Sequence, residues 1–342
     1  MSDTPGDERT LAGDIQRPVD VIEAEAVFTE LSRQLTRRSR ASGKQSSENE
    51  KGGTAHVQDL EKAHSDEYEE TFDLREYLSS SNDATQAAGI KHKHVGVTWE
   101  NLNVQVAGAT GHKVYVRTFG RLLKPGQMCL VLGCPGAGCT TFLKTLANER
   151  REYANVSGDI RYAGIDAKEM AKHYKGEVVY NQEDDIHIAT LTVSQTLDFA
   201  LSLKTPGPNG RLPGLSRKEF NEAVKNMLLK MLNIPHTANT YVGDEFVRGV
   251  SGGERKRVSL AEMMATRAHV LCYDNSTRGL DASTALDFVK SLRVMTDVLG
   301  QTVFVTLYQA GESIYELFDK VLVLDKGRQV YYGPHFMRAC VL

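Results

Sequence analysis

The chain has 342 residues, enough for one large domain or two modest ones. Its formal net charge of -3 is near neutral, so neither a general nucleic-acid surface nor a nucleic-acid partner is expected. No apolar run approaches the ~18 residues of a membrane-spanning helix, and the polar, acidic first residues are not a secretory signal. The five cysteines form no C-x-x-C pair, and an odd number suits reduced thiols in the cytosol.

Residues 1–90 are predicted to be a mostly disordered extension with short helices, because serine and charged residues dominate the composition. One short helix is expected from Val21 to Leu35, where apolar residues fall mostly on one face. A second is expected from Phe72 to Leu78, and Ser79–Gly89 is predicted to be a linker.

Alternating apolar residues begin at Val95 and continue through Val106, then from Val114 to Phe119, as in half-buried strands. A turn at Lys124–Gln127 leads into the apolar strand Leu130–Leu132. Antiparallel strands are therefore predicted to precede an α/β core with parallel strands.

The next stretch reads as strand, glycine-rich turn and helix: Gly133-Cys134-Pro135-Gly136-Ala137-Gly138-Cys139-Thr140-Thr141. It matches the phosphate-loop pattern G-x-x-x-x-G-K-[ST] at every fixed position except the lysine, which is Cys139. Thr140 stands where a hydroxyl is expected to reach Mg²⁺.

A phosphate loop offers backbone N–H groups and a helix N-terminus to phosphate oxygens, and its lysine adds a full charge. Hydrogen bonds to charged groups are worth roughly 1.5–3 kcal/mol, so losing the lysine is expected to weaken affinity by about tenfold to a hundredfold. Lys144 lies more than one helical turn further on and is expected to point away. The alternative is an ordinary glycine-rich turn that binds no nucleotide.

The chain then alternates between strands and helices. A hairpin is predicted at Gly158–Gly164, a short buried strand at Val178–Tyr180, and helical spacing from Thr192 to Ile234, interrupted at Pro206–Gly210. A last hairpin is expected between Val321 and Tyr332. These elements place an α/β domain at 91–334 with a helical insert at about 190–250, followed by a tail at 335–342 that we expect to be truncated.

Two further stretches suggest anion and metal chemistry. Val250-Ser251-Gly252-Gly253-Glu254 opens a helix, which makes a second candidate anion site. The apolar strand Val270–Tyr273 delivers Asp274 and Asn275, and an acidic residue after such a strand is where nucleotide enzymes hold Mg²⁺.

The order of these four pieces resembles the nucleotide-binding domain of ABC transporters, over residues of about 95–334. In detail it resembles the first such domain of fungal pleiotropic-drug-resistance transporters, full-size members of the G branch. Three stretches carry the closer match: Gly136–Thr141, Asp274-Asn275-Ser276-Thr277-Arg278-Gly279-Leu280-Asp281 and Val305-Thr306-Leu307-Tyr308-Gln309-Ala310-Gly311. The resemblance implies a P-loop NTPase core of ABC type, with an antiparallel β subdomain and a helical insert.

The resemblance also implies a role for each motif. Gly133–Thr141 corresponds to the Walker A loop, Asp274 to the Walker B acid, Val250–Glu254 to the signature motif, and Gly279-Leu280-Asp281 to the D-loop. Asn275 stands at the catalytic glutamate, Tyr308 at the switch histidine, and Glu183 or its neighbour Gln182 at the Q-loop glutamine. Tyr115 is a candidate for stacking on adenine.

The replaced lysine, glutamate and histidine together predict that the chain binds ATP and Mg²⁺ with little or no hydrolysis at its own loop. General-base help is typically worth about 10²–10⁴-fold in rate, and an asparagine cannot accept a proton at neutral pH. The signature motif is unchanged, so we expect it to complete the ATP site of a second nucleotide-binding domain.

Three interpretations remain open from the sequence. The chain is a fragment or truncated product of a multidrug exporter, working with membrane domains at the cytoplasmic face of a membrane, which we expect to be the plasma membrane. Alternatively, it is a free-standing cytosolic ATP-binding module that regulates another ATPase, or a fully active soluble ATPase. An apolar membrane-docking surface between Leu191 and Leu203 would favour the transporter.

Overall fold

The computed structural model of the chain describes residues 72–90, 92–107, 113–307 and 310–335. The chain divides into two units, and all described residues belong to the second, Glu70–Leu342. The helix predicted at Val21–Leu35 lies outside the described residues.

Within the described part, the strands form one sheet of eleven strands in the order β6-β5-β1-β2-β11-β10-β4-β9-β8-β7, with β3 paired to β1. The strands are β1 (Val97–Ala107), β2 (Lys113–Arg117), β3 (Arg121–Leu123), β4 (Met128–Leu132), β5 (Asn155–Tyr162), β6 (Ile165–Asp166), β7 (Val178–Asn181), β8 (Val270–Tyr273), β9 (Thr302–Thr306), β10 (Lys320–Asp325) and β11 (Arg328–Pro334).

The sheet has a parallel half and an antiparallel half, as the sequence predicts. Strands β10, β4, β9, β8 and β7 run parallel to one another. Strand β1 pairs antiparallel with β2, β3 and β5. The predicted hairpins are confirmed as β5–β6 and β10–β11. Strands β8 and β9 are buried along their whole length, which explains their unbroken apolar runs.

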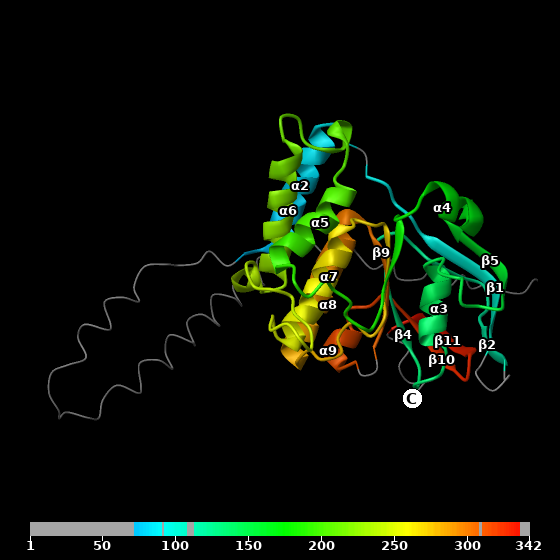
Figure 1. Cartoon of the computed structure of the whole chain (residues 1–342). Coiled ribbons are helices and arrows are strands. Elements are labelled where there is room, and N and C mark those ends of the chain that lie inside the picture. Colours follow the sequence, from blue (N-terminus) through cyan, green and yellow to red (C-terminus); the bar gives the residue numbers. More distant parts are fainter. Residues whose placement is uncertain (1–71, 91, 108–112, 308–309, 336–342) are drawn as a thin grey trace, which may run out of the picture. The chain divides into compact units, whose positions relative to one another are not determined.

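Helices cover both faces of the parallel half (Figure 1). They are α2 (Leu74–Ala87), α3 (Cys139–Leu146), α4 (Ala167–His173), α5 (Val193–Lys204), α6 (Arg217–Met231), α7 (Gly252–Ala265), α8 (Ala282–Leu299) and α9 (Glu312–Tyr315), with short 3₁₀ turns at Pro208–Gly210 and Pro235–Thr237. None of the described helices combines the length and apolarity needed to cross a bilayer.

Two separate apolar cores lie on the two faces. Met128 and Leu130 of β4 pack in the core that α5, α6, α7 and α8 build. Cys129 and Val131 of the same strand pack in the other core, with α3 and Trp99. Strand β4 therefore delivers the phosphate loop from the middle of the sheet, with alternate side chains fixed on both faces.

Helix α2 corrects the prediction of a linker at Ser79–Gly89, because the helix continues to Ala87. It begins at Asp73, whose carboxylate accepts from the N–H groups of Arg75 and Glu76 at 2.8 and 3.1 Å. Leu78 is buried in the core, and Arg75 pairs with Asp297 of α8 at 2.8 Å. Further along the helix the inner face carries Asn82 and Thr85, which are polar. The apolar spacing that predicts a helix therefore ends before the helix itself ends.

The predicted helical segment at residues 192–234 is confirmed as α5 and α6. Thr192 and Ser216 each form a capping box with the residue three positions on, Gln195 and Glu219. The eighteen-residue helix α8, capped by Asp281, is an element that the sequence analysis leaves unassigned.

Candidate nucleotide site

The phosphate loop, residues 133–141, joins β4 to α3, and its glycines are required by the backbone. Gly136 and Gly138 have φ values of 84° and 96°, in the left-handed region that favours glycine. A Cβ on Gly138 would lie 2.6 Å from a methyl of Val116, and one on Gly133 would lie 2.8 Å from Cys139 Sγ. The loop therefore holds a fixed, tightly packed conformation.

Helix α3 starts at Cys139 with its N-terminus uncapped. Gly138 occupies the N-cap position, and no side chain accepts from the first N–H groups of the helix. The first N–H groups of any α-helix have no intrahelical partner. This end of α3 therefore offers hydrogen-bond donors and positive partial charge to an anion.

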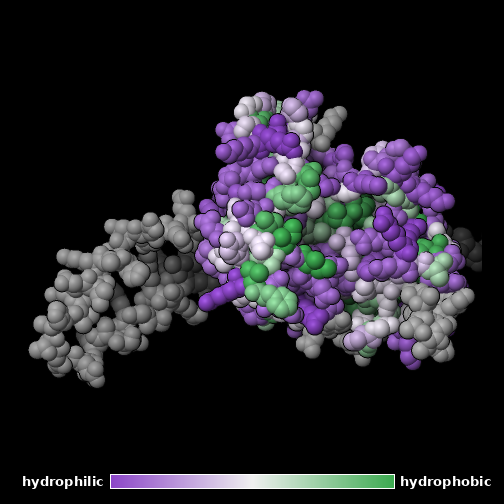
Figure 2. Space-filling view, viewed as in Figure 1, coloured by the Kyte–Doolittle hydropathy of each residue, from purple (hydrophilic) through white to green (hydrophobic). Residues whose placement is uncertain are grey.

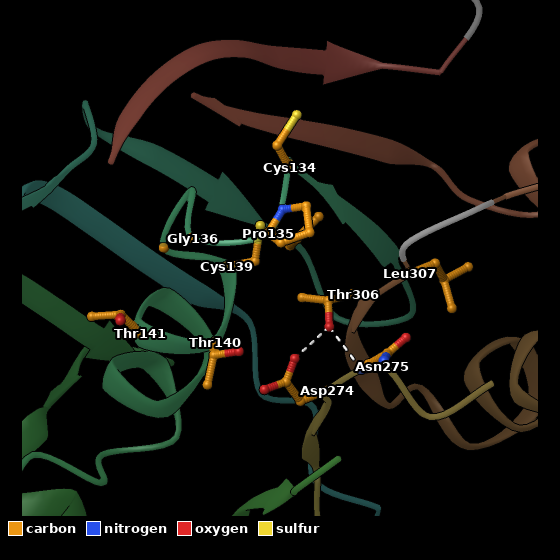
Figure 3. A pocket seen from close by; sticks show the side chains of 13 residues that line it. Cys134, Pro135, Gly136, Cys139, Thr140, Thr141, Asp274, Asn275, Thr306 and Leu307 are labelled. Carbon is orange, nitrogen blue, oxygen red and sulfur yellow. Dashed lines mark hydrogen bonds between the residues drawn. The ribbon is translucent and has the colours of Figure 1, made fainter. Parts of the chain in front are cut away.

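A cavity of about 300 Å³ lies against this loop (Figure 3). Residues of the loop line one side, including Thr140 and Thr141, and the other side is lined by Asp274, Asn275 and Thr306. The sequence analysis predicts Thr140 and Asp274 as metal-binding partners, and the structure brings both to this one cavity.

Asp274 follows β8 and is only 3 % exposed. Thr306, at the end of β9, donates its hydroxyl to Oδ1 of Asp274 at 2.6 Å. The hydroxyl of Tyr180, at the end of β7, donates to Oδ2 at 2.7 Å. Burial and this bond to a carboxylate raise the pKa of Tyr180 well above its usual range, so the phenol stays protonated. Two donors from neighbouring strands thus fix the orientation of the carboxylate.

Asn275 is buried beside Asp274 in a left-handed conformation, with φ 46°. Its backbone N–H donates to Thr306 Oγ1 at 2.8 Å. Its side-chain Nδ2 is buried and has no partner among the described residues. Since a buried donor without a partner costs about 1–3 kcal/mol, this amide is suited to donate to a ligand oxygen in the cavity.

Cys139 brings no charge to the cavity. Burial, with a smaller effect from the Asp274 carboxylate, raises the pKa of its thiol to about 11. Lys144 does not replace the missing lysine, because its Nζ pairs with Glu152 Oε2 at 2.9 Å. The described residues that line the cavity therefore include no lysine or arginine.

Among the described residues, no group of three His, Cys, Asp or Glu side chains is placed to hold a metal ion by itself. The Thr140 hydroxyl and the Asp274 carboxylate both face the cavity (Figure 3). Oxygen ligands of this kind suit Mg²⁺, which usually takes only one or two protein carboxylates and completes its shell with water and phosphate.

The stretch Val250–Glu254 starts helix α7. The Ser251 hydroxyl accepts from Glu254 N–H at 3.3 Å, and the Glu254 carboxylate accepts from Ser251 N–H at 2.8 Å. The neighbouring His236, with the Ser251 N–H, lowers the pKa of Glu254 to about 2. A Cβ on Gly252 would meet no atom within 4 Å, so this end of α7 presents bare backbone to its surroundings.

The remaining predicted residues lie apart from the cavity. Gly279, with φ 81°, and Leu280 lead to Asp281, which caps α8. The Glu183 carboxylate pairs with Arg278, and its carbonyl accepts from Lys256 Nζ of α7 at 2.5 Å. Gln182 follows β7 without reaching the phosphate-loop cavity.

The structure describes no side chain at two of the predicted positions. Tyr308 lies outside the described residues, immediately after Leu307, which does line the cavity. Tyr115 belongs to β2, and the described features of that strand do not include its side chain.

Sequence reasoning missed two residues that hold Asp274, namely Thr306 and Tyr180. Both stand at the carboxyl ends of parallel strands adjacent in the sheet to β8. The signal available for Thr306 is a hydroxyl residue ending a buried apolar run, which marks the sheet edge where ligands bind in α/β proteins.

An exposed apolar patch lies on α5 and the segment that follows β7. We define it by Ile186, Ile188, Phe199 and Leu203, whose side chains are 76, 64, 62 and 69 % exposed. Figure 2 shows apolar side chains gathered over this part of the molecule. Since exposed apolar clusters mark interaction surfaces, the patch is a candidate docking surface.

Comparison with known proteins gives two family matches. A model described as ABC transporter matches residues 120–278, and a model described as ABC-transporter N-terminal matches residues 30–122.

The relatives found are much longer than this chain. ABC multidrug transporter I of Aspergillus fumigatus is 51 % identical over 92 % of the chain, which spans 23 % of that protein. ABC multidrug transporter H of the same fungus is 47 % identical over 78 % of the chain, and ABC transporter G family member 11 of Dictyostelium discoideum is 45 % identical over 78 %. The chain spans 20 % of each of these last two.

Solved structures agree on the fold. A dimeric bacterial ABC transporter cassette superposes with a TM-score of 0.58 at 18 % identity, covering 70 % of this chain and 98 % of the cassette. A post-hydrolysis state of the same cassette, bound to ADP and Pi, gives a TM-score of 0.57 at 18 % identity.

Proposed function

Because the chain belongs to the ABC transporter family, we propose that it is the ATP-binding cassette of a multidrug exporter of the pleiotropic-drug-resistance type. It works with membrane domains and a second nucleotide-binding domain, at the cytoplasmic face of a membrane. The chain spans about a fifth to a quarter of the relatives named above, so transport belongs to the larger assembly.

One observation carries the proposal for the site: the cavity at the phosphate loop combines a helix N-terminus, a hydroxyl, a carboxylate and an unpartnered amide. The α3 N-terminus suits the phosphates of ATP. Thr140 and Asp274 suit Mg²⁺, which when bound neutralises phosphate charge. Asn275 Nδ2 is free to donate to a phosphate oxygen. The chain therefore binds Mg²⁺-ATP.

The same cavity is poorly equipped to hydrolyse the nucleotide. Cys139 stays a neutral thiol, and Lys144 is held by Glu152. An asparagine at position 275 orients groups but cannot accept a proton from water at neutral pH. The loss of general-base help alone is worth about 10²–10⁴-fold in rate. The resident ATP is therefore long-lived, and Tyr308 at the switch position adds no general base.

The exposed backbone N–H groups at Ser251-Gly252-Gly253 are available to a second nucleotide, one that a partner domain holds. Gly252 leaves open space at the start of α7, so a phosphate held by a second domain can approach the N–H groups there. This chain thus completes a partner's catalytic site while its own site holds a static ATP. By their correspondence to the Q-loop and the D-loop, we assign Glu183 or Gln182 and the Gly279–Asp281 segment to the contact with that second domain.

The apolar patch favours the exporter over the alternative of a free-standing regulatory module. Four large apolar side chains exposed on α5 and the preceding segment suit a surface that a membrane domain covers. A regulatory module needs the ATP site and the α7 N-terminus but gives this patch no role.

ATP turnover of the purified chain tests the proposal, measured with Mg²⁺, alone and with a second ABC nucleotide domain that keeps its lysine and catalytic carboxylate. We expect no turnover alone, and turnover above that of the second domain alone when the two are mixed. Robust turnover by this chain alone would make it an active ATPase and contradict the reading of Cys139 and Asn275.

Two variants locate the effect in the mixture. Ser251→Ala and Gly252→Asp should abolish the stimulation while leaving ATP binding to this chain intact. An unchanged stimulation in both would exclude the α7 N-terminus as a part of the active site. Full loss of ATP binding would instead show that the variants disturb the whole domain.

A further inference from the structure

A second cavity, of about 140 Å³, lies apart from the phosphate loop. Its walls come from α2, α6, the end of α7 and α8, and none of its lining residues also lines the phosphate-loop cavity. Neither the proposed ATP site nor the motifs found in the sequence give this cavity a role.

Apolar side chains from three helices form one part of the walls. Helix α6 contributes Val224 and Met227, α7 contributes Met264, and α8 contributes Met295 and Leu299. An apolar cavity of about 150 Å³ in a protein is large enough to bind benzene. Methionine side chains are flexible and polarisable, and they adapt to a ring placed against them. The cavity therefore fits one small aromatic ring.

Gln301, a residue of the cavity lining, carries a buried acceptor without a partner among the described residues. Gln301 is 4 % exposed, and its Nε2 donates to the carbonyl of Ala268 at 3.0 Å. That bond fixes which end of the amide carries the oxygen, and the Oε1 atom has no partner among the described residues. Leaving such an acceptor unpaired is unfavourable, so the site favours an occupant with an O–H or N–H donor.

A positive charge stands at the edge of the cavity. Arg267 is exposed, and its guanidinium lies 5.2 Å from the ring centre of Phe220, which also lines the cavity. None of the ion pairs among the described residues involves Arg267. Its φ of 52° is left-handed, a conformation uncommon for a long side chain.

His92 also lines the cavity near its edge, and its ring is uncharged. Its Nε2 lies 3.0 Å from the Thr85 hydroxyl of α2. Burial, and then the nearby Arg267, lower the pKa of His92 below its usual value, so the ring is neutral at neutral pH. Arg267 is the only arginine or lysine among the described residues that line the cavity.

We propose that this cavity binds a small aromatic carboxylate that also carries a hydroxyl group. The ring lies among the methionine and leucine side chains, the hydroxyl donates to Gln301 Oε1, and the carboxylate pairs with Arg267. Because Tyr77, Leu78 and Ser81 of α2 form one wall, the bound ligand holds α2 against α6 and α8.

Methyl NMR on the full chain with carbon-13-labelled methionine tests the proposal, and para-hydroxybenzoate is the probe. We expect saturable shifts of the Met227, Met264 and Met295 methyl signals, whereas that of Met170, which is buried in the other core, stays unchanged. Benzoate lacks the donor and phenol lacks the anion, so each should bind about tenfold or more weakly. No saturable shift at millimolar probe would mean that water alone fills the cavity, and the proposal would be wrong.

Two variants separate the polar contacts. Arg267→Gly suits the left-handed backbone, so the chain should stay folded while affinity for para-hydroxybenzoate falls about tenfold or more. Gln301→Met should reduce the affinity to that of benzoate. Lys326→Gly is the matched control, because it removes another cation at a left-handed position, φ 45°, outside the cavity.

The outcomes are distinct. Equal loss in Arg267→Gly and Lys326→Gly would mean that overall charge, and not the site, attracts the anion, and would overturn the proposal. Unchanged affinity in Gln301→Met would overturn the role of the hydroxyl donor. Each variant's unfolding transition reports whether a loss of binding comes from a loss of folding.

Discussion

The phenol of Tyr180 lies 2.7 Å from Oδ2 of Asp274 and donates to it, across 94 residues of sequence. The bond joins the ends of β7 and β8 and holds a carboxylate that is almost fully buried. We expect Tyr180→Phe to lower the free energy of unfolding by about 1.5–3 kcal/mol, the range for hydrogen bonds to charged groups. Urea unfolding measures the difference.

Tyr332→Phe is the control for this substitution, because the Tyr332 hydroxyl donates at the same 2.7 Å to the neutral carbonyl of Leu122. Its loss should be smaller, about 0.5–1.5 kcal/mol. Equal losses in the two variants would show that the charge on Asp274 contributes nothing to the Tyr180 bond.

Restoring the lysine of the phosphate loop should strengthen ATP binding. Cys139→Lys places a permanent charge where the present thiol is neutral, and we expect affinity for Mg²⁺-ATP to rise by about tenfold to a hundredfold. Titration with a fluorescent ATP analogue measures it, with Cys139→Ser as the uncharged control. A gain in Cys139→Ser as large as in Cys139→Lys would contradict the electrostatic explanation.

Gly252→Ala should separate folding from function at the start of α7. The added methyl meets no atom within 4 Å, so stability should change by no more than about 0.5 kcal/mol. In the mixture with a competent partner domain, turnover should fall by about 10²-fold, because a misplaced phosphate loses its alignment with the reacting groups. Unfolding curves and turnover are measured on the same preparation.

Glu177 should make stability depend on acid pH. Its hydrogen bond with His269 Nδ1, at 2.5 Å, and its pairing with Lys93 lower the pKa of Glu177 from 4.5 to about 2. Between these values the unfolded chain binds more protons than the folded chain, so the stabilisation is complete above pH 4.5 and is lost as pH falls toward 2. We expect Glu177→Gln to flatten the fall in unfolding free energy over this window.

The matched control for the acid dependence is Glu316→Gln, which changes an exposed glutamate after α9. Its profile should follow that of the unmodified chain. If Glu177→Gln shows the same steep fall as Glu316→Gln, the ion pair with His269 does not cause the acid sensitivity.

The sequence predicts those features that depend on neighbouring residues. The phosphate loop, the α7 N-terminus and Asp274 were identifiable because each sits at the junction of a strand or turn with a helix. Thr306 and Tyr180 were not, because their contact with Asp274 depends on the order of β7, β8 and β9 in the sheet. No local pattern contains that order.

Helix α2 shows a second limit of sequence reading. Its inner face changes from Leu78 to Asn82 and Thr85, and the polar residues there line a cavity. Apolar spacing consequently stops in mid-helix, and the second half reads as a linker. Helix α8 was not predicted for a different reason. Its N-cap, Asp281, is the last residue of the Gly279–Asp281 motif, and the prediction for this part of the chain ended with that motif.

Strand β4 limits how far the phosphate loop can move. Its side chains alternate between the two cores, with Met128 and Leu130 on one face and Cys129 and Val131 on the other. The strand can shift only if both cores repack together, because close-packed interiors yield little. We therefore expect the phosphate loop to keep its position when a nucleotide binds, with any movement confined to other surfaces of the domain.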